Sequence, residues 1–324
     1  MTAAPAAGPV NFLDPGVLAR IGNLELLARV VVEGFINGLH RAPHLGSSTD
    51  FAEHRPYMPG DDIRRIDWRL WARTDRFYVK EFEAETNTNF LAVLDVSPSM
   101  RYSGSEGDRS AVSKLEYGCF LAAALAYFSS KQRDRVGLAT FDGDLVDYVP
   151  PSAKHLQQVL HGLERASRGS SVESRLSTPD PRLPAPRASL LPPLKKLSES
   201  TRRRSIIALI SDFYEEPDAV MHAVAQLHGR GNDIVVFHIL DRHEIEFPFT
   251  DSSNFIDLES GEKMPVIPEY LRKQYREIIA RHSATLARRT REATVDYALF
   301  DTSKPLDAAL FTYLSSRQRL SRVR

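Results

Sequence analysis

The stretch FLAVLDVSPSM, residues 90–100, decides the fold, because it begins as an uninterrupted apolar run and ends in a polar turn. A short, continuous apolar run is typical of a strand that is buried on both faces, as in a parallel sheet covered by helices. Further runs follow along the chain: VGLATF (136–141), LVDYV (145–149), IIALISD (206–212), IVVFHIL (234–240) and VDYALF (295–300). Together they predict an α/β fold with a doubly wound, mostly parallel central sheet flanked by helices.

Helical patterns separate these expected strands. One helix is predicted to open at Ser113, because the box Ser113-Lys-Leu-Glu116 can cap free backbone N–H groups. Other helices are expected at 156–163, 217–227, 275–286 and from Pro305 onward. The segments 167–193, rich in proline and serine, and 241–268 are predicted to be irregular.

The N-terminal part of the chain has a different character. Residues 1–16 are small and contain proline, so we expect them to be disordered. Residues 17–86 are predicted to form an N-terminal extension that packs on the core and begins with a helix up to about residue 39. Residues 87–324 are predicted to form the core domain, with irregular insertions at about 167–193 and 241–268.

Composition argues against several classes of function. The 324 residues include 42 Lys+Arg and 42 Asp+Glu, so no net charge draws the chain to nucleic acid or to an anionic membrane. The sole cysteine, Cys119, lies in an apolar run and is interpreted as a core residue. The sequence shows neither a signal-peptide pattern nor an apolar stretch of about 20 residues, which favours a cytoplasmic location. It also lacks the glycine-rich patterns of nucleotide-binding loops.

Polar residues gather at the ends of two expected strands. Asp95, Ser97 and Ser99 follow the first buried strand, and Asp212 ends the strand IIALISD. Ligands bind in the crevice outside the carboxyl ends of parallel strands, so both groups are expected to face one crevice. Hydroxyl and carboxylate oxygens suit Mg²⁺, Mn²⁺ or Ca²⁺. The alternative interpretation is local, with Asp95 and the serines bonding backbone groups of a turn.

The pattern D-x-S-x-S at residues 95–99 resembles the metal-ion-dependent adhesion site of von Willebrand factor A domains. A longer pattern, G-x-S-x-x-F-x-E-x-R-x-Y-x-P-G-D-D-x-R-x-I-D-W followed by A-R, runs from Gly46 to Arg73 and resembles the bacterial family called domain of unknown function fifty-eight. The resemblance continues through FEAET, DRVGL, VPPSAKHL, ISDFYE and IEFPF, and through F-x-D-L-E at 255–259.

This resemblance implies a von Willebrand factor A-like, Rossmann-like core and a MoxR-type AAA+ ATPase as partner, in chaperone-like assembly or maturation. It implies that Ser97 and Ser99 contact the metal directly, while Asp95 and Asp212 act through bound waters. A third-loop threonine is also expected, but the corresponding region offers Ser170, Ser171 or Thr178 without a clear match. The metal is therefore expected to bind weakly, or only when an acidic side chain of the partner completes its coordination.

The stretch 50–85 holds many acidic and basic residues and both tryptophans. We interpret it as a structural lattice of ion pairs and hydrogen bonds around the tryptophans, carried by Arg55, Asp61, Asp62, Arg64, Asp67, Trp68 and Arg73. The alternative is enzymatic, with Glu53, Asp61, Asp62 and Asp67 holding metal for phosphoester hydrolysis. The sequence as a whole favours the first interpretation, in which the chain is a metal-assisted protein-interaction module and not an enzyme.

Overall fold

The structure of the chain is a computed structural model that describes residues 15–19, 21, 23–41, 54–57, 68–80, 88–104, 111–168, 189–201, 203–306 and 313. The chain divides into two compact units. One consists of residues 1–35 with 88–324, and the other of residues 36–87. Each unit is considered by itself.

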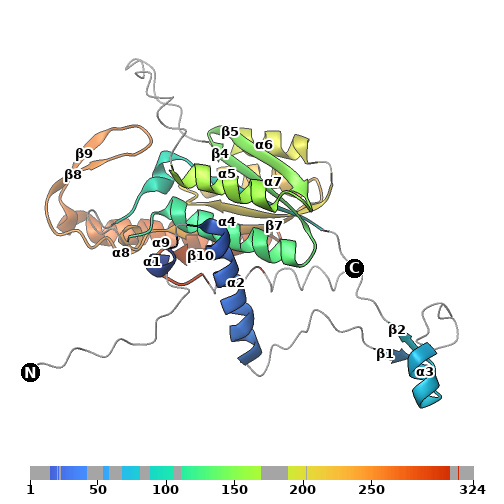
Figure 1. The fold of residues 1–324 in the computed structure, drawn as a ribbon. Helices are drawn as coiled ribbons and strands as arrows, with labels where there is room; N and C mark the ends of the chain where they lie inside the picture. Colours follow the sequence, from blue (N-terminus) through green and yellow to red (C-terminus); the bar gives the residue numbers. More distant parts are fainter. Residues whose placement is uncertain are drawn as a thin grey trace, which may run out of the picture. The chain divides into compact units, whose positions relative to one another are not determined.

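The larger unit is built on a central sheet (Figure 1). In the described part of the chain this sheet has six strands, in the order β10-β7-β6-β3-β4-β5. Its strands are β3 (Asn89–Asp95), β4 (Arg135–Asp142), β5 (Asp144–Ser152), β6 (Ser205–Ser211), β7 (Asp233–Leu240) and β10 (Asp296–Asp301). All neighbouring pairs are parallel except β4 and β5, which are antiparallel. The expected α/β fold with a mostly parallel sheet is thus confirmed.

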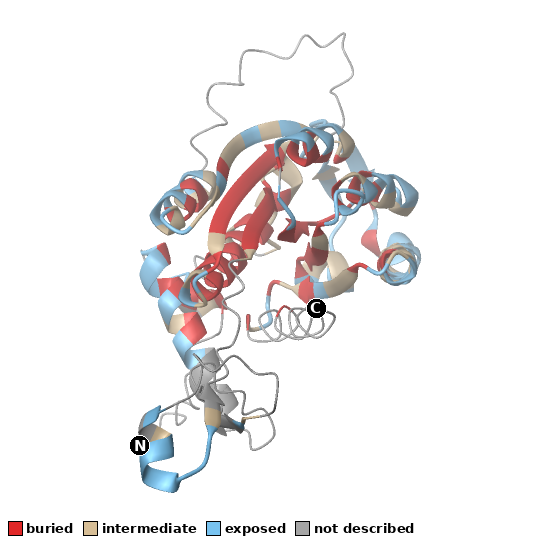
Figure 2. Ribbon diagram, turned by 90° about the vertical axis from the view of Figure 1, so that its right-hand side faces the viewer, coloured by how far each residue is buried: buried red, intermediate tan, exposed pale blue. Residues whose placement is uncertain are grey.

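Helices cover both faces of this sheet. They are α4 (Lys114–Lys131), α5 (Leu156–Arg168), α6 (Leu191–Ser200), α7 (Pro217–His228) and α9 (Pro268–Glu292). Leu91 and Val93 of β3 face the helices α6, α7 and α9 in one apolar cluster. On the opposite face α4 approaches β3 so closely that a Cβ on Gly118 would lie 2.9 Å from Leu94 Cδ1. The four inner strands, β3, β4, β6 and β7, are therefore buried over almost their whole length (Figure 2), which explains their unbroken apolar sequence. The edge strands β5 and β10 are partly exposed.

The antiparallel edge requires a glycine. A Cβ on Gly137 of β4 would lie 2.6 Å from the carbonyl oxygen of Val149 and 2.8 Å from the nitrogen of Pro151, both in β5. Because these are backbone atoms of a paired strand, they cannot move aside cheaply. The pairing of β4 and β5 also shifts register between Val136 and Leu138. Gly137 therefore allows the two strands to approach.

Helix α4 begins as its sequence predicts. Ser113 Oγ accepts a hydrogen bond from the Glu116 N–H at 3.2 Å, and the Ser113 N–H donates to Glu116 Oε2 at 2.9 Å. The helix is buried over most of its length, and Cys119 lies within it. Burial raises the pKa of the Cys119 thiol to about 12, so that it behaves as a core residue, as expected.

Two segments predicted to be irregular contain more regular structure than expected. Helix α6 begins at Leu191, inside the segment 167–193, because two prolines can occupy the first turn of a helix; residues 169–188 lie outside the described residues. The segment 241–268 holds the short helix α8 (Arg242–Glu246) and a hairpin of β8 (Ser253–Ile256) and β9 (Lys263–Val266). Strands of four residues carry too little alternation to be recognised in a sequence.

The N-terminal helical pattern gives α1 (Pro15–Leu18) and α2 (Leu24–Arg41). Residues 1–14 and most of the helix expected after Pro305 lie outside the described residues. Tyr313 is described, and its ring packs edge-on against Phe90 at 5.6 Å. None of the described helices is long and apolar enough to cross a membrane.

The smaller unit contains strands β1 (His54–Pro56) and β2 (Tyr78–Lys80), which pair antiparallel, and helix α3 (Trp68–Thr74). Its described rings form a cluster in which Trp71 stacks on Phe77 at 5.9 Å and Trp68 lies edge-on to Trp71 at 6.1 Å. Trp68 is 55% exposed. Arg55 lies in β1 and Arg73 in α3, whereas Asp61, Asp62, Arg64 and Asp67 lie outside the described residues. The lattice of ion pairs therefore stays a prediction.

Candidate functional site

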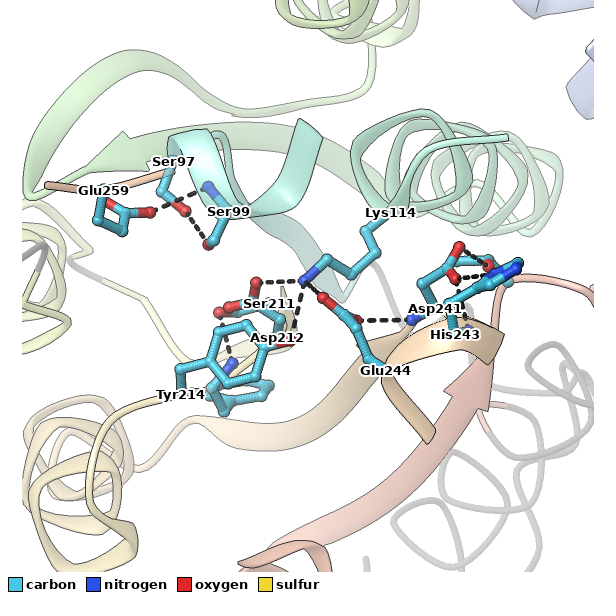
Figure 3. A network of polar contacts seen from close by, with 12 residues as sticks. Ser97, Ser99, Lys114, Ser211, Asp212, Tyr214, Asp241, His243, Glu244 and Glu259 are labelled. Carbon is cyan, nitrogen blue, oxygen red and sulfur yellow. Dashed lines mark hydrogen bonds and ion pairs between the residues drawn. The ribbon is translucent and has the colours of Figure 1, made fainter. Parts of the chain in front are cut away.

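The sheet brings the two predicted oxygen groups to one edge. Strands β3 and β6 are parallel neighbours, and Leu94 is paired with Ile210, so that Asp95 and Ser211 come next to each other at the carboxyl ends. The Ser211 hydroxyl donates to Asp95 Oδ2 at 2.7 Å. Asp212 follows directly and its charge acts on Asp95. Four predicted residues, Asp95, Ser97, Ser99 and Asp212, thus gather at the carboxyl ends of these strands, at the position of the expected crevice (Figure 3 shows the last three).

The turn after β3 orients its serines through Asp95. The Ser97 N–H donates to Asp95 Oδ1 at 2.9 Å, which closes a local turn. Pro98 then starts the short 3₁₀ helix η2 (Pro98–Arg101). This geometry leaves the hydroxyl oxygens of Ser97 and Ser99 3.1 Å apart. The local interpretation therefore accounts for one oxygen of Asp95, while the other reaches a different strand.

Asp95 is buried, and this burial raises the pKa of its carboxyl group to about 7, with a further contribution from the charge of Asp212. The hydrogen bonds from Ser211 and Ser97 act in the opposite direction. A buried carboxylate beside another carboxylate is costly to ionise, and a cation nearby would favour its charged form. A positive charge near Asp95 would therefore lower this pKa.

Lys114, the first residue of α4, supplies such a charge on one side of the crevice. Its side chain is fully buried, and its ammonium group lies 2.8 Å from Asp212 Oδ2 and 2.8 Å from Glu244 Oε1. It also donates to the Tyr214 hydroxyl at 3.3 Å and lies 4.6 Å from the centre of that ring. Burial acts to lower the pKa of Lys114, but the two carboxylates outweigh it and raise the pKa, so the lysine is charged.

This ion-paired group continues to the end of β7. Glu244 Oε2 accepts a hydrogen bond from the Asp241 N–H at 2.8 Å, which completes the capping box of α8. Asp241 Oδ2 accepts from the Thr302 hydroxyl at 3.2 Å. A Cβ on Gly104 would lie 1.9 Å from His243 Nδ1 and 2.6 Å from Asp241 Oδ1, so a larger residue there would displace the His243 side chain. The ends of β3, β6 and β7 therefore share one polar network.

A second acid reaches the crevice from the β8–β9 hairpin. Glu259 Oε1 accepts a hydrogen bond from the Ser99 N–H at 3.0 Å (Figure 3). The side chain is half-buried, and burial raises its pKa, with smaller contributions in the same direction from Asp142 and Asp212. Glu259 therefore places a carboxylate beside the turn that carries the serines.

The separation of the two serine hydroxyl oxygens is compatible with binding to a small, hard cation. Two oxygens bound at neighbouring positions of an octahedral Mg²⁺ lie about 3.0 Å apart, given a metal–oxygen distance of about 2.1 Å. The two serine hydroxyls are 3.1 Å apart. The described residues include no group of three or more His, Cys, Asp or Glu residues suited to a metal ion. A cation at this crevice would consequently depend on the serine hydroxyls together with the carboxylates.

Several predicted residues cannot be placed. Ser171, with its alternatives Ser170 and Thr178, lies outside the described residues. The same holds for the acidic cluster of the enzymatic alternative, Glu53, Asp61, Asp62 and Asp67. Both hypotheses stay predictions.

The sequence interpretation missed Lys114, Glu244 and Glu259. A signal for Lys114 existed, since a cation in the first turn opposes the helix dipole and the rest of α4 is almost wholly apolar. Glu259 ends the F-x-D-L-E pattern at 255–259 and lies in a segment that looked irregular. Glu244 gave no signal beyond its place three residues after Asp241.

The fold is that of an α/β protein with a cluster of hydroxyl and carboxylate groups at the carboxyl ends of its parallel strands. The chain belongs to the family described as "Protein of unknown function DUF58", whose sequence profile matches residues 53–285. It is similar to uncharacterized proteins of Mycobacterium tuberculosis and Mycobacterium bovis, each 27% identical over 314 residues that cover 94% of this chain and 91% of the relative.

The chain is also similar to two solved structures. The conserved hypothetical protein BatB from Bacteroides thetaiotaomicron is 16% identical, covers 71% of this chain and 99% of its own, and has a TM-score of 0.44. An aerotolerance-related membrane protein from Bacteroides fragilis is 16% identical, covers 68% of this chain and 96% of its own, and has a TM-score of 0.43.

Proposed function

We propose that the chain is a protein-interaction module that docks a partner at the crevice beyond β3 and β6, with the help of a divalent cation. The observation that carries the proposal is the convergence of Ser97, Ser99 and Asp95 with the end of β6, where Asp212 stands. Hydroxyl and carboxylate oxygens in this arrangement suit Mg²⁺ or Mn²⁺ more than Zn²⁺.

The likeness to the metal-ion-dependent adhesion site of von Willebrand factor A domains suggests how docking works. Ser97 and Ser99 would bind the cation directly, and Asp95 and Asp212 would hold it through waters. Neutral hydroxyls leave a cation with most of its charge, so an acidic side chain of a partner binds well as a further ligand. Partner binding would then depend on Mg²⁺, which makes the contact switchable.

The partner that the sequence resemblance suggests is a MoxR-type AAA+ ATPase, in a chaperone-like role within the cytoplasm. The chain has 42 acidic and 42 basic residues, so its net charge does not attract a partner from a distance. This agrees with recognition of the partner through a local charge at one site. On this proposal the acidic side chain belongs to the ATPase, and the crevice supports no chemical turnover.

The test is a pull-down of a purified MoxR-type ATPase with the full chain, with Mg²⁺ and with EDTA. In Mg²⁺, the double variant Ser97→Ala/Ser99→Ala is expected to bind the ATPase at least tenfold more weakly than wild type does. In EDTA, the variant and wild type are expected to bind equally weakly. The control is Ser200→Ala, which changes an exposed serine at the end of α6, just before the amino end of β6. Equal binding by wild type and the Ser97/Ser99 variant in both conditions would remove the cation from the mechanism.

A further inference from the structure

The turn of the β8–β9 hairpin is built to present Glu259. The Glu259 N–H donates to Asp257 Oδ1 at 2.9 Å, and the Ser260 hydroxyl donates to Asp257 Oδ2 at 2.7 Å. Gly261 adopts a positive φ of 72°, which favours glycine, and its N–H donates to the Asp257 carbonyl at 2.7 Å. These bonds hold the backbone of the turn from which the Glu259 side chain reaches the Ser99 N–H.

The base of the hairpin is anchored separately from its tip. Phe255 of β8 packs against Phe249 at 5.1 Å and against Phe247 at 5.8 Å. Arg272 of α9 donates to the carbonyl of Phe249 at 2.7 Å. The strands themselves are short and carry exposed apolar side chains such as Met264, and Figure 1 shows the hairpin projecting from the α8–α9 end. The tip is joined to the serine turn by the bond from Ser99 to Glu259.

The charge around Glu259 is unbalanced. The neighbouring charges of Asp142 and Asp212 disfavour its ionised form. Among the residues that the structure describes, no Lys, Arg or His forms an ion pair with Glu259 or Asp95, in contrast to Asp212 and Glu244. A carboxylate held by a backbone N–H next to two hydroxyls, with like charges around it, has the environment of a cation ligand.

We propose that Glu259 is the chain's own ligand to the cation that Ser97 and Ser99 bind, and that it holds the position an acidic side chain of the partner would take. This inference rests on the proposed function. The hairpin is then a built-in competitor, and docking requires that its tip leave the crevice while the aromatic base stays in place. The position of the tip thus reports whether the site is closed by the chain itself or by a partner.

The test is a titration of the full chain with Mn²⁺ alone, followed by electron paramagnetic resonance of the free ion. Glu259→Gln is expected to weaken Mn²⁺ binding at least tenfold, because a neutral amide is a poorer ligand. Each bound Mn²⁺ should also show a higher water proton relaxation rate in this variant, since a water replaces the missing carboxylate. Glu262→Gln, an exposed glutamate of the same hairpin, is the matched control and should bind as wild type does.

The outcomes separate this inference from the proposed function. If Ser97→Ala/Ser99→Ala abolishes Mn²⁺ binding but Glu259→Gln leaves affinity and relaxation unchanged, the internal ligand is overturned and the cation site stands. If wild type binds no Mn²⁺, or the serine variant binds as wild type does, both are overturned. Circular dichroism of each variant confirms that it is folded, so that weaker binding reflects a lost ligand.

Discussion

The two sides of the crevice stabilise their carboxylates in different ways, one by an ion pair and the other by hydrogen bonds. On the ion-pair side, the carboxylates of Asp212 and Glu244 meet the ammonium group of Lys114 at 2.8 Å each. On the hydroxyl side, the carboxylates of Asp95 and Glu259 meet hydrogen-bond donors, from Ser211 at 2.7 Å and from the Ser99 N–H at 3.0 Å. The carboxylates on the ion-pair side are thus neutralised by a lysine of the chain, whereas those on the hydroxyl side have only neutral hydrogen-bond partners within the part of the chain that the structure describes.

This difference explains why we assign binding to the hydroxyl side. Asp212 and Glu244 already share the charge of Lys114, so we do not expect a further cation to bind either carboxylate directly. Asp212 would contact a cation on the hydroxyl side only through a water molecule. Hydrogen-bond donors stabilise a carboxylate only partly, which agrees with the raised pKa of Asp95 and of Glu259. Lys114 thus fixes the framework of the crevice, and the serine turn offers the place for an exchangeable ligand.

The largest effect is expected from removal of the cation on the ion-pair side. Lys114→Ala leaves two buried carboxylates without their partner, so we expect the free energy of unfolding to fall by about 3–5 kcal/mol in a urea titration. Lys196→Ala is the control, because Lys196 pairs with Asp144 at 2.6 Å on the surface and should cost less than about 1 kcal/mol. A cost for Lys114→Ala as small as that of the control would show that the pair does not organise the crevice.

A pH dependence should be found beside the ion-pair side, at His238. Burial, with smaller contributions from the charges of His282 and Lys114, lowers the pKa of His238 to about 3. Below about pH 6.5 the His238 imidazole therefore binds a proton in the unfolded chain but stays neutral in the folded chain. Neutral His238 therefore does not lower the free energy of unfolding above pH 6.5, and the folded state loses stability progressively as the pH falls from 6.5 toward 3.

At pH 5.0 this single histidine should cost about 2 kcal/mol of unfolding free energy relative to pH 7.5, from a slope of about 1.4 kcal/mol per pH unit. His238→Gln should reduce the difference between the two pH values by about that amount. His222→Gln, at an exposed position of α7, should leave the difference unchanged. Urea titrations at both pH values measure it, and an equal acid response in His238→Gln and wild type would speak against a neutral, buried His238.

The hydroxyl side should respond more weakly to the loss of one donor. Ser211→Ala removes the bond to Asp95 Oδ2 and the acceptor of the Phe213 N–H at 3.1 Å. We expect a loss of about 1–2 kcal/mol in unfolding free energy, because both groups stay buried without these partners. Ser205→Ala, at the other end of β6, loses only a bond to a carbonyl and should cost less. The reverse order of the two variants would mean that Asp95 does not depend on Ser211.

The sequence predicted the sheet well, for a physical reason. Strands buried on both faces, such as FLAVLD and IIALIS, need unbroken apolar runs, and such runs are readable without any knowledge of their neighbours. The capping box at Ser113 is equally local and was found correctly. The convergence of Asp95 with the end of β6 followed from the rule that parallel strands share a carboxyl edge.

The remaining parts of the site depend on contacts between residues far apart in the chain. Glu259 meets Ser99 across 160 positions, and Lys114 meets Glu244 across 130. Neither contact follows from periodicity or spacing, since each is created by a loop or a helix end whose direction is set by packing. The hairpin turn at Asp257 forms through side-chain bonds that a short strand pattern does not reveal.

The most direct test of a cation on the hydroxyl side is anomalous diffraction from crystals of the full chain grown with Mn²⁺. The account predicts an anomalous peak within about 2.3 Å of the hydroxyl oxygens of Ser97 and Ser99, with a carboxylate oxygen of Glu259 or of a neighbouring acid also bound. The account would be contradicted by a peak between the carboxylates of Asp212 and Glu244, where the Lys114 ammonium group lies. A fully occupied Mn²⁺ elsewhere on the chain, with no peak beside the serines, would also contradict it.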